Sequence, residues 1–173
     1  DGGVLAASIT ERNFLGKGIV LDADLQVSND GVKGKLTYAK PNFNYSDNTL
    51  FTSIKSTSTD YIGDYGYKTN ENSFSIGTTF QQYENFYISP KLLTSFETLE
   101  TTNKASANLK KQKGDYFDTY FNYGIDYDLR NQAYQPTDGT RTFFSQQLPI
   151  ISERNELINT FEISKYQMLP SEM

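Results

Sequence analysis

The chain has 173 residues, enough for one domain, with a net charge of −5 and neither histidine nor cysteine. The missing cysteine excludes disulfides, thiolate zinc sites and a cysteine nucleophile, and the missing histidine removes the commonest general base and metal ligand. The isoelectric point near 4.8 leaves no basic field for nucleic acid, so no nucleic-acid partner is expected. No run of 18 apolar residues occurs, which excludes a transmembrane helix.

The remaining composition combines low hydropathy with many aromatic residues. Mean hydropathy is −0.60 and only 36% of residues are hydrophobic, yet 13 Tyr and 12 Phe make the chain 14% aromatic. A disordered chain has few aromatic residues, so disorder is excluded. A barrel whose strands turn one apolar face to lipid and one polar face to a wet lumen has this composition.

Period-two alternation begins near the start of the chain. From Ile19 to Ser28 every odd position is apolar, and most of the positions between are polar. Weaker alternation runs through Val4–Ile9, Lys33–Lys40 and Leu50–Lys55. Because alternate side chains of a strand point to opposite faces, these segments are predicted as strands with one apolar face.

The same pattern continues to the end of the chain and is clearest from Phe117 to Asp128. There the odd positions carry Phe117, Thr119, Phe121, Tyr123, Ile125 and Tyr127, and the even positions are mostly polar. Further strands are predicted at Phe74–Gln81, Phe86–Phe96, Thr140–Ile150 and Leu157–Tyr166. About nine strands result, most of about nine to eleven residues, the length that a tilted strand needs to cross a bilayer.

The connections between these strands differ in length. Two long polar stretches, Ser56–Asn72 and Thr98–Asp115, fall on one side of an up-and-down sheet. The shorter connections Asn13–Gly18, Pro41–Asp47, Gln82–Asn85 and Arg130–Gly139 fall on the other side. Outer-membrane barrels keep long loops outside and short turns in the periplasm, so Asp1 is expected on the outer side.

The fold class predicted from these patterns is all-β, an antiparallel up-and-down transmembrane β-barrel. The chain supplies about nine strands of a larger barrel. An odd number of antiparallel strands cannot close on itself, because its first and last strands run in the same direction. We therefore expect two unpaired edges, near Val4–Ile9 and Leu157–Tyr166.

Several turn sequences resemble those of BamA-type assembly proteins, the bacterial surface antigen family. Asn13–Gly18 is similar to the family's NxLGxG turn, Tyr38–Pro41 to a strand ending in a Pro-aromatic turn, and Tyr134–Arg141 to its PTxG turn. Tyr123–Asn131 resembles the strand before that turn, and Tyr166–Pro170 a later strand end. The residues that match the motifs are Asn13, Phe14, Leu15, Gly16, Gly18, Pro41, Asp128, Arg130, Pro136, Thr137, Asp138, Gly139 and Arg141.

The resemblance implies a sixteen-stranded barrel in the outer membrane of a Gram-negative bacterium, preceded by periplasmic POTRA domains. It implies a role in folding and inserting other barrel proteins. The implied partners are the lipid bilayer, lipopolysaccharide, unfolded outer-membrane proteins and accessory assembly lipoproteins. Residues 1–173 are then a partial barrel domain, and the gate strand, the POTRA domains, the C-terminal strands and the Arg-Gly-Phe loop are expected outside them.

Other functions stay open on the residues alone. A two-partner-secretion or organelle-type translocase has the same architecture, and a passive porin or transporter barrel has the same strand pattern. A soluble carbohydrate-binding β protein is the weakest alternative, because a soluble sandwich uses shorter strands of about five or six residues.

Carboxylate pairs are the residues most open to a catalytic or metal-binding interpretation. Asp22/Asp24 and Asp126/Asp128 lie two apart on one face, as a glycosidase pair or a cation site requires, but a wet lumen wall has the same pattern. Asp126 and Asp128 are instead expected to pair with Arg130 and Arg141 at the rim of the lumen. No catalytic, cofactor-binding or metal-binding residue is predicted, and the protein is not expected to be an enzyme.

Two charged segments of the long connections are further candidate ligand sites. Asp60–Asp64 lacks the spacing of a calcium-binding loop, and Lys110–Lys113 is expected to be a solvated cluster that touches lipopolysaccharide phosphates at most.

Overall fold

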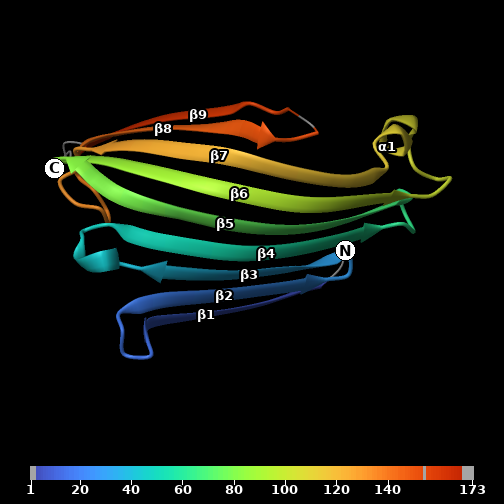
Figure 1. The fold of residues 1–173 in the computed structure, drawn as a ribbon, viewed down its shortest axis with the longest axis horizontal. Helices are drawn as coiled ribbons and strands as arrows, with labels where there is room; N and C mark the ends of the chain where they lie inside the picture. Colours follow the sequence, from blue (N-terminus) through green and yellow to red (C-terminus); the bar gives the residue numbers. More distant parts are fainter. Residues whose placement is uncertain (1–2, 154, 169–173) are drawn as a thin grey trace, which may run out of the picture.

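The computed structural model describes residues 3–153 and 155–168, which form a single antiparallel sheet of nine strands (Figure 1). The strands follow one another along the sheet in chain order, and each pairs with the next. Their bounds are β1 Val4–Phe14, β2 Ile19–Ser28, β3 Gly31–Lys40, β4 Thr49–Tyr61, β5 Tyr67–Tyr83, β6 Phe86–Thr101, β7 Gly114–Asp128, β8 Asp138–Ile151 and β9 Ile158–Gln167.

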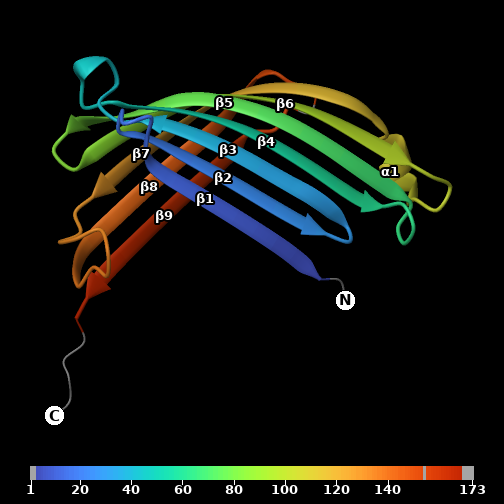
Figure 2. The same ribbon diagram turned by 90° about the horizontal axis from the view of Figure 1, so that it is seen from below.

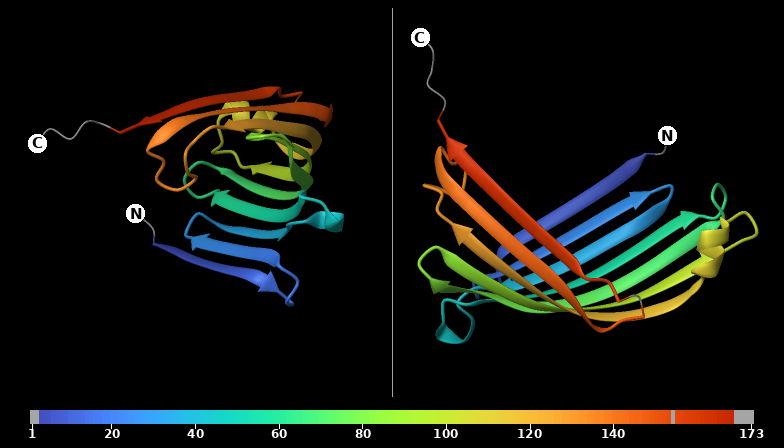
Figure 3. Two further views of the ribbon diagram at one scale, coloured as in Figure 1. Left: turned by 90° about the vertical axis from the view of Figure 1, so that its left-hand side faces the viewer. Right: turned by 90° about the horizontal axis from the view of Figure 1, so that it is seen from above.

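The sheet is strongly curved and open, with β1 and β9 as its two edges (Figures 2 and 3). This arrangement confirms the all-β, antiparallel, up-and-down fold and the two unpaired edges expected from the sequence. Each strand is twisted relative to its neighbour, so that the sheet bends into an open trough (Figure 3).

The few helical residues lie in the connections. A 3-10 helix, η1 Phe43–Tyr45, follows β3, and a short helix, α1 Ala107–Lys111, joins β6 to β7. Ser106 caps α1, since its hydroxyl accepts a hydrogen bond of 3.3 Å from the Leu109 N–H. Within the described residues no helix has the length and apolar character needed to span a membrane.

The first of the two long loops expected from the sequence is largely strand, and the second is shortened at both ends, which corrects that prediction. Residues 56–61 belong to β4 and residues 67–72 to β5, so the connection between them contains only residues 62–66. In the same way β6 continues to Thr101 and β7 begins at Gly114, which leaves residues 102–113 as the connection. Thr59, expected in a loop, pairs with Thr69 across β4 and β5.

The physical reason for this error is that the ends of these strands are polar on both faces. Ser56 donates a 2.7 Å hydrogen bond to Asn72, and Thr98 donates one of 2.8 Å to Asp115, in positions where apolar residues stand further along the strands. Backbone pairing continues past the apolar segment, but alternation disappears once water reaches both faces. The strands β4 to β8 therefore have 13 to 17 residues, longer than predicted, whereas β1, β2, β3 and β9 have the predicted 10 or 11.

Three of the four turns on the other side are shorter than the sequence suggested, and the connection after β3, residues 41–48, is one residue longer. Asn13 and Phe14 end β1, and Asp138 and Gly139 begin β8, although all four were expected in turns. The position expected for Asp1 and the end of the motif at Leu169 and Pro170 lie outside the described residues.

Candidate functional site

The two faces of β7 differ in an unusual way. Phe117, Phe121 and Tyr127 point to one face and are 46%, 37% and 43% exposed. Asp118 and Tyr120 point to the other and are 0% and 6% exposed. We call these the apolar face and the polar face of the sheet. A soluble sheet buries its apolar face, so this arrangement is inverted.

The apolar face forms a band across all nine strands. On β7 the band runs from Phe117 to Tyr127, which at the rise and tilt of barrel strands corresponds to a height of about 25 Å. Cross-strand rows continue it, for example Ile76, Leu92 and Phe121 on β5, β6 and β7. A continuous, exposed apolar band of this height matches the hydrocarbon layer that an outer-membrane barrel meets.

On the polar face, hydrogen bonds between hydroxyl groups link neighbouring strands. Ser53 and Ser75 lie 2.8 Å apart between β4 and β5, and Thr79 and Ser89 lie 2.9 Å apart between β5 and β6. Ser75 is buried by its neighbours on the inside of the curve. These bonds satisfy polar groups that the curvature of the sheet removes from water.

Asp118 is a structural residue that the sequence analysis missed. Its carboxylate accepts hydrogen bonds from the Ser152 hydroxyl at 2.7 Å and from the Glu153 N–H at 3.1 Å. These two residues lie in the connection after β8, so Asp118 holds that connection against the polar face. The alternation had placed Asp118 on the correct face, but no local signal indicated which loop would cover it.

Asp128 and Arg130 form an ion pair at the turn after β7. The guanidinium Nε and Nη2 of Arg130 donate to the two carboxylate oxygens of Asp128 at 2.8 and 2.6 Å, which is a bidentate pair. Asp128 lies past Tyr127, the last residue of the apolar band. The side-chain hydrogen bond from Arg130 lowers the pKa of Asp128 to about 2, and the same bond raises the pKa of Arg130.

A second ion pair joins β7 to β8 on the polar face. Arg141 Nε donates to both carboxylate oxygens of Asp126, at 2.9 and 3.1 Å, and its Nη2 donates to one of them. The expected pairing of these four charged residues is therefore present. Each carboxylate is engaged by an arginine, so neither serves as a free acid or base in this arrangement.

The turn between β7 and β8 is organised by Asn131. Its side-chain oxygen accepts hydrogen bonds from the N–H groups of Thr137 and Asp138, and its amide donates to the Thr137 hydroxyl at 2.8 Å. Gly139 has φ +105°, and a Cβ there would collide with the Leu129 carbonyl oxygen. Only glycine fits this position. Pro136 lies in the same turn, just before these residues.

The turn between β1 and β2 is closed by Asn13. Its backbone oxygen accepts a hydrogen bond from the Gly16 N–H at 2.9 Å, and its side-chain oxygen accepts one from the Gly18 N–H at 2.8 Å. Leu15, Gly16 and Gly18 all have positive φ, which glycine adopts without strain. Phe14 pairs with Ile19 at the base of this turn.

The other candidates from the sequence have structural surroundings. Pro41 follows the last residue of β3 and begins the connection that contains η1. Asp24 accepts a 2.6 Å hydrogen bond from Ser8, and Asp60 accepts one of 3.0 Å from the Ile62 N–H. Among the residues that the structure describes, no three acidic side chains come together as a metal site would require.

Comparison with known proteins places this geometry in a family. The Omp85 superfamily domain matches residues 13–170. A search of curated protein sequences finds no match. Among solved structures, the fold is similar to the crystal structure of BamA from Haemophilus ducreyi lacking POTRA domains 1-3, with a TM-score of 0.77 and 22% identity.

This likeness covers 97% of the chain and 35% of the BamA chain, so the chain spans about a third of the length of that relative. At 22% identity it shows the fold alone: a nine-stranded part of a BamA-like barrel. Because the Omp85 domain matches almost the whole sequence, the chain belongs to the Omp85 superfamily.

Proposed function

We propose that these nine strands are part of the barrel wall of an outer-membrane protein-assembly factor, which folds and inserts other β-barrel proteins. Membership of the Omp85 superfamily and the BamA-like fold support this proposal. The observation that carries it is the exposed apolar band of this Omp85 chain, since a wall inverted in this way is stable only in lipid. Its proposed location is the outer membrane of a Gram-negative bacterium.

The proposed mechanism is non-covalent and needs no cofactor or metal. A weakened seam of the complete barrel offers a strand edge to an incoming strand, which adds to it by backbone pairing. The nine strands here are the rigid part of the wall: β4 and β5, for instance, pair without interruption from Thr49–Thr79 to Tyr61–Tyr67. We place the gate strand, the remaining strands of a sixteen-stranded barrel and the POTRA domains outside this segment.

The proposed partners are the lipids that surround the wall and the proteins that the complete barrel assembles or binds. Acyl chains contact the apolar band, and lipopolysaccharide phosphates face the lysines beside α1 in the outer connection. One of these, Lys110, is held by a 2.8 Å hydrogen bond to the Asn103 carbonyl oxygen. Unfolded outer-membrane proteins are the substrates, and accessory assembly lipoproteins bind elsewhere on the complete protein.

Reconstitution tests the proposal. The full-length protein is placed in liposomes, a urea-unfolded barrel protein is added, and folding is followed by its resistance to protease and its shifted gel mobility. We expect faster folding than in protein-free liposomes or in liposomes holding an unrelated barrel of similar size. Equal rates in all three would refute an assembly role.

The same liposomes separate the proposal from its alternatives. A passive porin or transporter gives steady ion conductance without accelerating client folding. A secretion-type translocase carries an added polypeptide into the lumen of the liposome instead of leaving it in the bilayer.

A further inference from the structure

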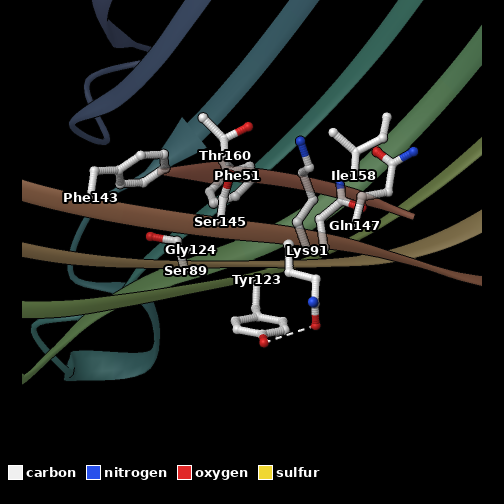
Figure 4. Close-up of a pocket in the computed structure, with 12 residues that line it drawn as sticks. Phe51, Ser89, Lys91, Tyr123, Gly124, Phe143, Ser145, Gln147, Ile158 and Thr160 are labelled. Atoms are coloured by element: carbon white, nitrogen blue, oxygen red, sulfur yellow. Dashed lines mark hydrogen bonds between the residues drawn. The ribbon is translucent and has the colours of Figure 1, made fainter. Parts of the chain in front are cut away.

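A cavity of about 340 Å³ lies on the polar face of the sheet (Figure 4), and one of its lining residues, Phe143, is the cross-strand partner of Asp126. Its lining residues come from β4 and from β6 to β9, and five of them belong to one row of cross-strand partners. In order across the sheet these five are Phe51, Lys91, Asn122, Gln147 and Ile158, with Gly77 of β5 between the first two. Tyr123 lies on the opposite side of the sheet, where its hydroxyl donates to Gln146 (Figure 4).

Two glycines give the cavity its aromatic walls. A Cβ at Gly77 would lie 2.5 Å from the ring of Phe51, and a Cβ at Gly124 would lie 3.3 Å from the ring of Phe143. Each ring therefore lies close to a glycine of a neighbouring strand. The glycines leave room for the two rings, which line the cavity together with Ile158. An apolar side chain of a ligand finds a matching surface here.

Lys91 supplies the charge. Its side chain extends from β6 to the same side as Phe51 and Ile158 (Figure 4). Within the described part of the chain its ammonium has neither an ion pair nor a hydrogen bond, unlike Lys55, which pairs with Glu71 at 3.5 Å. Near Lys91 the polar-face rows on either side carry no carboxylate: one contains Ser75, Leu93 and Tyr120 on β5 to β7 and reaches Asp22 only on β2, and the other contains Thr79, Ser89, Gly124 and Ser145 on β5 to β8.

Asn122 adds a buried hydrogen-bond acceptor that is unsatisfied. Its side-chain oxygen is buried and, among the described residues, has no hydrogen-bond partner. An unsatisfied buried acceptor is unfavourable by about 1–3 kcal/mol, so a ligand that brings an N–H donor gains by reaching it after a small rotation of the side chain. A polypeptide backbone carries such donors, whereas a fatty acid or a simple anion does not.

We propose that this cavity binds an extended polypeptide segment in which a carboxylate side chain stands two residues from an aromatic or aliphatic one, so that both point to the same face of the segment. Lys91 pairs with the carboxylate, Phe51 and Phe143 contact the apolar side chain, and Asn122 accepts from the peptide backbone. The inference rests on the proposed function in one respect, namely that the segment belongs to an unfolded client barrel. Residues two apart in an extended client strand share a face, so both side chains can enter the cavity together.

The test uses two fluorescent ten-residue peptides that differ at one central position only, with Phe-Ser-Glu at the centre of one and Phe-Ser-Gln at the centre of the other. Their binding to the full-length protein in lipid nanodiscs is measured by fluorescence anisotropy. We expect the Glu peptide to bind about tenfold more tightly than the Gln peptide, as a charge-assisted hydrogen bond predicts. Lys91→Gln should abolish that difference and leave the affinity of the Gln peptide unchanged.

Three matched variants define the site. Lys35→Gln removes another lysine of the polar face and should preserve the preference for Glu, because Lys35 lies on β3 outside the cavity. Phe143→Ala should weaken both peptides equally. Lys91→Glu should reverse the preference, toward a peptide with Phe-Ser-Lys at its centre.

Contrary outcomes are equally specific. Equal binding of the Glu and Gln peptides, no binding of either, or loss of the preference in Lys35→Gln would each overturn the inference. If the wild-type protein still accelerates client folding in liposomes while the peptides fail to bind, this cavity is not the binding site and the proposed function stands.

Discussion

Phe117 and Asp118 are consecutive residues of β7, yet Phe117 is 46% exposed and Asp118 is completely buried. Strand geometry sends the two side chains to opposite faces. The polar face lies on the inside of the curve, where side chains crowd together, and the connection after β8 covers Asp118 as well. The apolar side chain is left to the outside, which suits a wall whose outer solvent is lipid.

The first prediction concerns the apolar band. Phe121→Lys places an ammonium near the middle of the band and should lower the free energy of unfolding by about 2–4 kcal/mol. Ser145→Lys, on the polar face, should change it by under ~1 kcal/mol because water solvates that charge. Unfolding of the full-length barrel in liposomes measures both.

Asn122 would be a poor control for this experiment, because it lies directly opposite Lys91 and a second lysine there would add repulsion. If Phe121→Lys and Ser145→Lys destabilise the barrel equally, the assignment of the faces is wrong.

The second prediction concerns Asp118. Asp118→Ala removes the acceptor of the Ser152 hydroxyl and the Glu153 N–H, so we expect a loss of about 1–3 kcal/mol in the free energy of unfolding. Hydrogen exchange at the Glu153 amide should accelerate. Ser95→Ala, directly opposite Asp118 on β6, is the control and should leave that exchange rate unchanged.

The third prediction concerns pH and the Asp128–Arg130 pair. The pKa of Asp128 is lowered to about 2 from 3.8, so its carboxylate binds protons more weakly in the folded state. The pair's contribution to stability is therefore complete above pH 3.8 and is lost as the pH falls toward 2. Thermal unfolding should show Asp128→Asn less stable than wild type at neutral pH, with the two curves converging near pH 2. A difference that is independent of pH would contradict the ion pair.

The fourth prediction compares two glycines with positive φ. Gly139→Ala meets both an unfavourable φ of +105° and a collision with the Leu129 carbonyl oxygen, whereas Gly16→Ala meets only the φ of +68° in open space. We expect Gly16→Ala to lose about 1–2 kcal/mol, the usual left-handed penalty, and Gly139→Ala to lose more. Chemical unfolding of the two full-length variants measures the difference, and equal losses would argue against the close approach at Gly139.

The fifth prediction concerns the sides of the membrane. These 173 residues contain no cysteine, so Asp64→Cys and Asn103→Cys introduce the only thiols of this segment, in the connections after β4 and β6, into a full-length protein freed of any other cysteine. A membrane-impermeant reagent should label both on intact cells that carry the full-length protein. Asn44→Cys and Gln135→Cys, in the connections after β3 and β7, should react only once the outer membrane is opened. The reverse pattern would invert the proposed topology.

The sequence by itself determined the order, direction and faces of the strands. In β7 the alternation from Phe117 to Tyr127 identified every residue of the apolar band correctly, because a period of two is a local property of extended backbone. The turn at Asn13–Gly18 was also predictable from the sequence, because the asparagine hydrogen bond and the positive φ of the glycines involve only a few neighbouring residues.

Only the tertiary structure decided how far the strands extend and what the polar face does. The ends of β4, β5 and β6 lose alternation where water reaches both faces, so their pairing shows only when neighbouring strands are in register. Asp118 meets Ser152 across 34 residues of chain, and Lys91 stands beside Asn122 only through the register of β6 and β7. Such contacts depend on the alignment of whole strands, which no local sequence pattern encodes.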